Sequence, residues 1–257
     1  NVLLARVADA MTSIRVHETA ELRRLATHDS LTGLPNRALF LQRLAEFIRG
    51  EATPERPLGV MLVGLDGFKS INSAYGQRLG DLVLQEVARR ISGEPRPRAS
   101  LSRIKGDEFA AILPGLTDAD AANVLGRRLL LKIAEPFTVE GYELNLRASI
   151  GVALAPADGM DAELLLAHAN VAMDRAKADG GDRIQYFSAD LNLDLQRQRA
   201  LEAALRRAIK AQEFELHYQP KFEIATNRLI GAEALMRWRH PVEGLMPPGE
   251  FIPLAER

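Results

Sequence analysis

Residues 103–113 read "RIKGDEFAAIL", and this stretch predicts a β-hairpin with an acidic tip. Gly106 and Asp107 supply turn chemistry between two short apolar, strand-like runs. The turn carries two adjacent carboxylates, because Asp107 is followed directly by Glu108. Neighbouring residues of a strand face opposite sides, so one carboxylate can face a pocket while the other points into the structure.

A third carboxylate stands at the end of a predicted buried strand. Asp66 follows the continuous apolar run at residues 58–65. Two acidic strand edges side by side would suit a hard divalent cation, with substrate phosphates as the remaining ligands. Acids at strand ends and hairpin tips are commonly just solvated, so spacing alone leaves both interpretations open.

The segments around the hairpin predict an α+β domain. The order β-α-(α)-β-β-α-β-β-α-β indicates a sheet with helices packed on it. Periodicity and turn residues place its elements at 58–65 (strand), 79–91 (helix), 100–104 and 108–113 (hairpin), 118–134 (helix), 137–155 (a second hairpin turning at Glu140-Gly141), 161–181 (a helix ended by Gly180-Gly181) and 183–187 (strand).

Two further segments flank this domain. Residues 1–26 have apolar residues at helical spacing, which fits an amphipathic helix on its own domain or a connector helix that pairs with a second copy. Residues 188–213 are polar first and then helical, and we interpret them as a linker that becomes a new helix. Strand-like runs at 214–224 and 229–240 begin a second unit.

The composition is that of an ordinary globular protein. Hydrophobic residues make up 47% and charged residues 26%, with a formal net charge of −1, so no global field favours nucleic acid or an anionic membrane. The absence of cysteine excludes disulfides and thiolate metal sites. No apolar run approaches a membrane span, and the start lacks a Met and a signal-peptide layout. We therefore expect a cytoplasmic piece of a longer protein.

Several motifs in one order resemble a known family. The stretches "DSLTGLPNR", "GLDGFKSINSAYGQRLGD", "SRIKGDEFAAIL" and "ASIGVALAP" resemble the GGDEF domain. The stretches "LHYQPKFEI", "GAEALMRWRHP" and "GEFIPLAE" resemble the opening of an EAL domain. The resemblance implies a connector helix (1–26), a GGDEF domain (27–187), a linker (188–202) and the N-terminal part of an EAL domain (203–257).

The resemblance also implies a fold and an activity. GGDEF domains resemble nucleotidyl cyclase palms, with a central antiparallel-rich sheet surrounded by helices. They are typically diguanylate cyclases that condense two GTP into cyclic di-GMP, with one nucleotide on each subunit of a homodimer. Two metal ions, Mg²⁺ or Mn²⁺, polarise the triphosphate. EAL domains are metal-dependent phosphodiesterases that linearise cyclic di-GMP on a TIM-like barrel.

The metal-binding part of the motif is altered in this chain. Asp107 and Glu108 match the acids of the signature turn, the catalytic pair, and Asp107 matches its metal ligand. Lys105 replaces the first glycine of the turn. The second metal-ligand aspartate of the family falls at Gly64, and rescue by Asp66 would need a bulge, because alternate residues lie about 7 Å apart along a strand. We therefore expect cyclase activity to be lost or very weak.

The nucleotide-binding part of the motif is better preserved. Asn72 and Asp81 match the guanine-recognition pair, so GTP binding is expected to persist. Phe68 and Lys69 match the phosphate-side loop, and Lys177 matches the lysine near the end of the last helix. Gly181 departs from the family, which has a basic residue at that position. Arg96 matches the arginine of the family's inhibitory site, but the acid of that site is replaced by Ala99, so only a remnant of the motif is left.

The EAL motif is intact as far as it extends. Glu233 matches the first metal-binding glutamate, and Gln219 and Arg237 match positions that contact cyclic di-GMP. A TIM barrel needs about 250 residues, so this chain alone is not expected to hydrolyse the dinucleotide. Trp238 is expected to be barrel core. The histidines lack metal-ligand spacing.

Three functions remain open. The first is a degenerate GGDEF domain that binds GTP and regulates an attached EAL phosphodiesterase. The second is an active diguanylate cyclase with variant metal ligation. The third is a non-enzymatic dimerisation module, suggested by the N-terminal helix.

Overall fold

The computed structural model describes residues 24–93, 100–116 and 119–255, which form two compact units divided after Asn192. Residues 24–27 are helical. The rest of the predicted connector helix, and Arg96 with Ala99, lie outside the described residues. Within the described residues, no helix has the length and apolarity needed to span a membrane.

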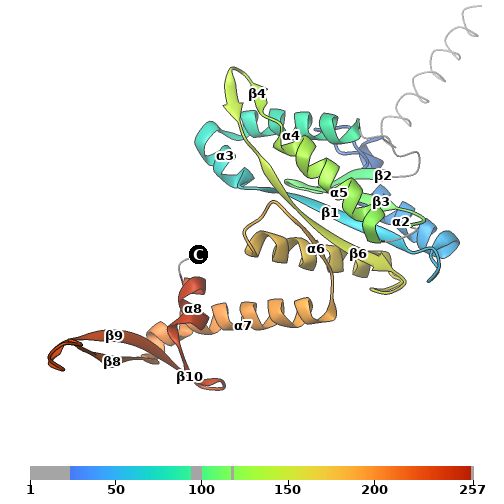
Figure 1. The fold of residues 1–257 in the computed structure, drawn as a ribbon. Coiled ribbons are helices and arrows are strands. Elements are labelled where there is room, and N and C mark those ends of the chain that lie inside the picture. The colour runs from blue at the N-terminus through green and yellow to red at the C-terminus, as the bar shows by residue number, and fades with distance from the viewer. Residues whose placement is uncertain (1–23, 94–99, 117–118, 256–257) are drawn as a thin grey trace, which may run out of the picture. The chain divides into compact units, whose positions relative to one another are not determined.

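A five-stranded sheet in the order β2-β3-β1-β6-β7 forms the centre of the first unit (Figure 1). Three of its pairings are antiparallel and only the β6–β7 pairing is parallel. The antiparallel-rich sheet of the prediction is therefore confirmed. Its strands are β1 (Leu58–Asp66), β2 (Ser100–Lys105), β3 (Glu108–Leu113), β6 (Arg147–Ala155) and β7 (Ile184–Tyr186).

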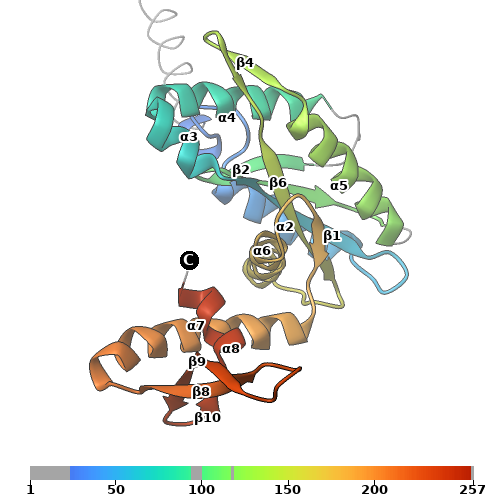
Figure 2. The same cartoon turned by 60° about the vertical axis from the view of Figure 1, so that its left-hand side comes forward.

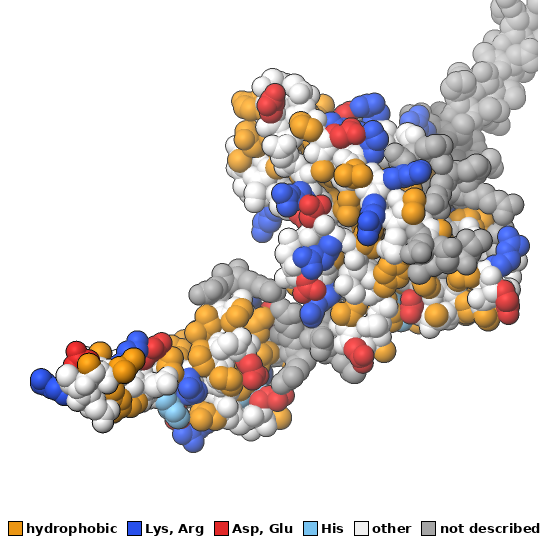
Figure 3. Space-filling view, in the orientation of Figure 1, with side chains coloured by type: hydrophobic (Ala, Val, Ile, Leu, Met, Phe, Trp, Pro, Cys, Tyr) orange, Lys and Arg blue, Asp and Glu red, His pale blue; other side chains and the backbone are white. Residues whose placement is uncertain are grey.

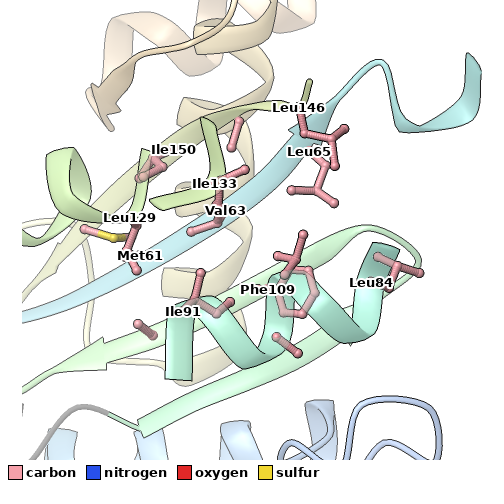
Figure 4. Close-up of a cluster of buried hydrophobic side chains, with 14 of the residues drawn as sticks. Met61, Val63, Leu65, Leu84, Ile91, Phe109, Leu129, Ile133, Leu146 and Ile150 are labelled. Atoms are coloured by element: carbon pink, nitrogen blue, oxygen red, sulfur yellow. The ribbon is translucent and has the colours of Figure 1, made fainter. Parts of the chain in front are cut away.

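Helices cover both faces of this sheet, as Figures 1 and 2 show. The flanking helices are α2 (Arg37–Glu51), α3 (Phe68–Tyr75), α4 (Gln77–Ser92), α5 (Ala119–Ala134) and α6 (Ala162–Ala178). Odd-numbered residues of β1, such as Met61 and Val63, pack with α4 and α5 in the larger core cluster (Figure 4). Even-numbered residues such as Val60 and Leu62 pack with α2 and α6. Because β1 is buried on both faces, its sequence is continuously apolar instead of alternating.

Two predicted segments differ in detail. The second hairpin turns at Glu140-Gly141 as predicted, but it joins only β4 (Phe137–Val139) and β5 (Tyr142–Leu144), which form a separate two-stranded sheet. Residues 145 and 146 separate β5 from β6 and belong to neither strand, and the Leu146 side chain is buried in the core.

The predicted linker at 188–202 is helical from its second residue. Helix α7 runs continuously over Ala189–Ala211. Residues 188–213 contain neither glycine nor proline and are rich in Leu, Ala, Gln and Arg, all good helix formers. Polarity alone was therefore a poor indicator of a loop in this segment.

The second unit is a small sheet in the order β10-β9-β8 with its own core. Its remaining elements are β8 (Phe214–Phe222), β9 (Leu229–His240), β10 (Gly244–Met246) and α8 (Pro248–Ala255). Trp238 is fully buried against Leu205, Ala208 and Phe251, and its Nε1 donates to Glu213 Oε2 at 3.0 Å. The prediction that Trp238 belongs to a core is confirmed.

Charges are mixed over the surface that Figure 3 presents. Lys and Arg side chains are interspersed there with Asp, Glu and hydrophobic ones. This agrees with a net charge of −1. The second unit also bears an apolar hollow of about 730 Å³, lined mainly by Leu205, Ile209, Phe214, Met236 and Phe251.

Candidate functional site

The site forms where three neighbouring strands bring one residue each into a row. Gly64 of β1 is paired with Glu108 of β3 on one side and with Ser149 of β6 on the other. Residues paired directly across antiparallel strands share a face. All three positions, together with Asp66, therefore lie on the sheet face that α6 covers.

Two side chains of α6 occupy the space above Gly64. A Cβ atom built on Gly64 would lie 2.6 Å from Met173 Sδ and 2.7 Å from Lys177 Nζ. The position that matches the family's metal-binding aspartate thus carries no carboxylate. An ammonium group lies at that place instead.

The Asp66 carboxylate is already engaged. Ser149 Oγ, which is fully buried, donates to Asp66 Oδ1 at 2.8 Å, and the Asp182 backbone N–H donates to Oδ2 at 3.1 Å. A Cβ on Gly181 would lie 2.8 Å from Asp66 Oδ2. The absence of a side chain at Gly181 therefore makes room for this carboxylate. Sequence analysis missed Ser149, although its place in the "ASIG" motif was a signal.

The signature turn pairs its lysine with its second acid. Gly106 has a φ of 48°, a left-handed conformation that suits glycine. Lys105 Nζ lies 3.5 Å from Glu108 Oε1. Burial raises the pKa of Glu108, and the charges of Lys105 and Lys177 oppose that rise. Lys105 therefore contacts the turn by its ion pair with Glu108. The Lys105 side chain itself is 68% exposed.

These residues do not fit a two-metal site. Of the three acids, Asp66 accepts hydrogen bonds within the protein and Glu108 is paired with Lys105. Only Asp107 has no such engagement in the described contacts. Among the residues that the structure describes, no three His, Asp or Glu side chains converge as a metal site. Divalent cations at this place would have to share Asp107 with the two carboxylates that are already engaged, Asp66 and Glu108.

The predicted guanine-binding pair lies on two consecutive helices. Asn72 is on α3, and Asp81 is on α4 directly after Gly80. A Cβ on Gly80 would lie 1.9 Å from Asn72 Oδ1, so glycine is required for this close approach. Asn72 Oδ1 is buried and has no hydrogen-bond partner within the described part of the chain. An unsatisfied buried acceptor is uncommon and points to a missing donor.

The predicted phosphate-side residues have unlike environments. Phe68 is 7% exposed and packs in the larger core cluster, so its side chain supports the fold. Lys69 is exposed on the first turn of α3. Gly67, with a φ of 70°, turns the chain from β1 into α3. Of this loop, only the Lys69 side chain is accessible.

A guanidinium group fixes the signature turn to the segment before α2. Arg103 donates to the Gly106 carbonyl from Nη2 at 2.7 Å and from Nε at 3.1 Å. Its Nη1 donates to Asp29 Oδ1 at 2.9 Å, which also accepts from Thr32. Sequence analysis did not single out Arg103 or Asp29, although each stands inside a quoted motif.

We expect Asp29 to make stability depend on acid pH. Burial acts to raise the pKa of Asp29, but hydrogen bonds from Thr32 and Arg103 outweigh it and hold the pKa below its usual range. The stabilisation is present above the ordinary carboxyl pKa of about 3.9 and is lost as pH falls through the lower folded pKa. Asp29→Asn should cost about 1–2 kcal/mol near neutral pH in urea unfolding.

The matched measurement repeats the urea unfolding at decreasing pH, from about pH 4 down through the lowered pKa of folded Asp29. The difference between the wild type and Asp29→Asn should shrink there. A difference that stays constant over this range would show that the ion pair with Arg103 does not determine the effect.

The predicted EAL residues share one face of the second unit. Gln219 of β8 is paired directly with Glu233 of β9, and Arg237 lies on the same face of β9. Trp238 points to the opposite, buried face. Glu233 Oε2 lies 3.0 Å from Lys221 Nζ. The structure therefore brings Gln219 and Glu233 together, on an exposed face that also carries Arg237.

Family models match both parts of the chain. The model described as "Diguanylate cyclase, GGDEF domain" matches residues 26–183, and the EAL domain model matches residues 202–257. Among solved structures, the GGDEF domain of TpbB (YfiN) from Pseudomonas aeruginosa is 33% identical, with a TM-score of 0.63, and covers 66% of this chain and 99% of its own. A sensory box/GGDEF family protein from Caulobacter crescentus is 39% identical, with a TM-score of 0.57, over 60% of this chain and 99% of its own.

Curated relatives have both kinds of activity in their names. The bifunctional diguanylate cyclase/cyclic di-GMP phosphodiesterase MucR of P. aeruginosa is 41% identical over 99% of this chain. The cyclic di-GMP phosphodiesterase NbdA of the same organism is 40% identical over 93% of it. The chain spans only 37% of the length of MucR and 30% of that of NbdA.

Proposed function

Because this chain belongs to the GGDEF family of cyclic di-GMP signalling domains and continues into an EAL match, we propose that its first unit is a GTP-binding regulatory domain. In this proposal, residues 27–187 bind GTP, have lost most cyclase activity, and regulate the attached EAL phosphodiesterase. The observation that carries it is the buried, unpartnered Asn72 Oδ1, which lies against Gly80, the residue before Asp81.

Guanine fits this pair of acceptors chemically. Its N2 amino group and N1–H are neighbouring donors on one edge. The Asn72 amide oxygen and the Asp81 carboxylate are two acceptors on adjoining helices. Adenine lacks this pair of adjacent donors. We therefore expect the site to prefer GTP over ATP.

The proposed loss of cyclase activity has a separate basis. Gly64 supplies no anionic ligand, and Asp66 is held by Ser149 and the Asp182 backbone. Metal-assisted attack by a 3′-hydroxyl requires cations that clamp the triphosphate. The remaining acids of the turn, Asp107 and Glu108, are too few for that arrangement.

We expect Asn72→Ala to weaken GTP binding by about tenfold, the effect of one lost hydrogen bond to a buried acceptor. Equilibrium binding of labelled GTP, with ATP as competitor, measures this. Ser73→Ala is the matched control, because Ser73 is the exposed neighbour on α3 and, within the described part of the chain, its side chain bonds only to the Lys69 carbonyl. Equal competition by ATP and GTP, or no saturable binding at all, would rule out the proposed guanine site.

An active diguanylate cyclase is the second candidate. It is favoured by the retained Asp107-Glu108 turn and by the 41% identity to a protein named as bifunctional. Such an enzyme would act as a homodimer with Mg²⁺ or Mn²⁺. Chromatography of nucleotides after incubation with GTP and Mn²⁺ separates the two candidates: cyclic di-GMP would establish the cyclase, and intact GTP with measurable binding would support the regulator. The absence of any nucleotide effect on the full-length phosphodiesterase would instead favour the dimerisation module.

A further inference from the structure

The side chain of Lys177 occupies the place where the family motif puts a metal-binding carboxylate. Its Nζ and Cε atoms lie 2.7 Å and 2.9 Å from the position of a Cβ on Gly64. Lys177 is half-buried in the last turn of α6. The last turn of a helix is the end at which the helix dipole attracts cationic side chains.

The acids around Lys177 are already engaged with other groups. Asp66 accepts from Ser149 and from the Asp182 backbone, and Glu108 is paired with Lys105. Among the described residues, no ion pair within 4.0 Å involves Lys177. An ammonium group has three donors. The donors of Lys177 therefore remain open to an anionic ligand.

We propose that the Lys177 ammonium takes the place of a divalent cation at Gly64, so that this site binds the phosphate chain of a nucleotide without a metal ion. The inference rests on the proposed nucleotide binding and specifies how the phosphates are held. A lysine ammonium is a compact point charge that binds phosphate oxygens directly. It also repels a divalent cation from the same space, where the carboxylate that would attract one is missing.

Two exposed lysines, Lys105 and Lys69, stand close in sequence to residues of this site. Lys105 ends β2 at the signature turn, and Lys69 is the second residue of α3, three residues after Asp66. Their accessible ammonium groups are screened by water and salt, whereas that of half-buried Lys177 is screened less. The phosphate contact made by Lys177 should therefore contribute the most to affinity.

The test measures binding of labelled GTP to the 257-residue chain, once with Mg²⁺ and once with EDTA. The wild type should bind with the same affinity in both. Lys177→Gln keeps most of the side-chain stem and removes the charge, and it should weaken binding by about tenfold or more under both conditions. Lys132→Gln is the matched control, since Lys132 is an exposed lysine on α5 paired with Glu135.

Each outcome bears on a different claim. Binding that disappears with EDTA would overturn the inference and leave the proposed GTP binding intact. Wild-type affinity in Lys177→Gln would also overturn it. No saturable GTP binding with or without Mg²⁺ would remove the proposed function itself. The comparison of EDTA with Mg²⁺ uses the wild type alone, so it holds even if Lys177→Gln fails to fold.

Discussion

Replacing Gly151 with alanine should lower the free energy of unfolding of the first unit by about 3 kcal/mol or more. Gly151 lies on β6, on the face that α6 covers. A Cβ there would lie 2.0 Å from the Ala169 carbonyl oxygen and 2.3 Å from the Met173 backbone nitrogen. Both atoms belong to the helix backbone, so no side-chain rotation relieves the contact and α6 must move off the sheet.

Urea unfolding followed by circular dichroism measures this loss. Gly50→Ala is the matched control: Gly50 lies in α2 of the same unit, and a Cβ there has no neighbour within 4 Å. That change should be neutral or stabilise the unit by up to about 1 kcal/mol, because alanine is the better helix former. If Gly151→Ala unfolds at the same urea concentration as the wild type, α6 does not lie this close to β6.

Replacing Gly64 with aspartate should make nucleotide binding depend on Mg²⁺ or Mn²⁺. The new carboxylate would restore one anionic ligand beside Asp107 and Glu108 and would pair with the Lys177 ammonium when no metal is present. Without a metal ion, GTP affinity should fall by about tenfold, because the lysine charge is then neutralised. Titration of labelled GTP with EDTA and with Mn²⁺ measures both effects.

The control for this variant is Gly64→Ala, which adds a Cβ without a charge. It meets the same two side-chain ends, Met173 Sδ and Lys177 Nζ. We expect it to bind GTP equally with and without metal. If Gly64→Ala and Gly64→Asp respond alike to Mn²⁺, crowding instead of charge would explain the change.

The strands and the hairpin were predictable because their signals are local. The apolar run at 58–65 is a strand buried on both faces, and Gly106 turns the hairpin that the quoted stretch predicts. Asn36, directly before α2, caps that helix by accepting from the Leu39 backbone N–H at 3.1 Å. In each case the deciding residues are neighbours in the chain.

The contacts of the site were not predictable in the same way. Lys177 is more than a hundred residues from Gly64 in the chain, and only the packing of α6 on β1 brings them together. The engagement of Asp66 by Ser149 likewise depends on the register of β1 with β6. The sequence indicated which ligands were missing, and the structure places Lys177 and Met173 in the space above Gly64.

The two glycines that face α6 differ in what natural variation can do with them. Gly151 lies against helix backbone, so any side chain there forces α6 away from the sheet, whatever the nucleotide chemistry. Gly64 lies against the ends of two flexible side chains, so an acidic residue fits there once those side chains move, without a change in the backbone. The architecture of the first unit therefore constrains Gly151 through backbone contacts, whereas it constrains Gly64 only through side chains that can move.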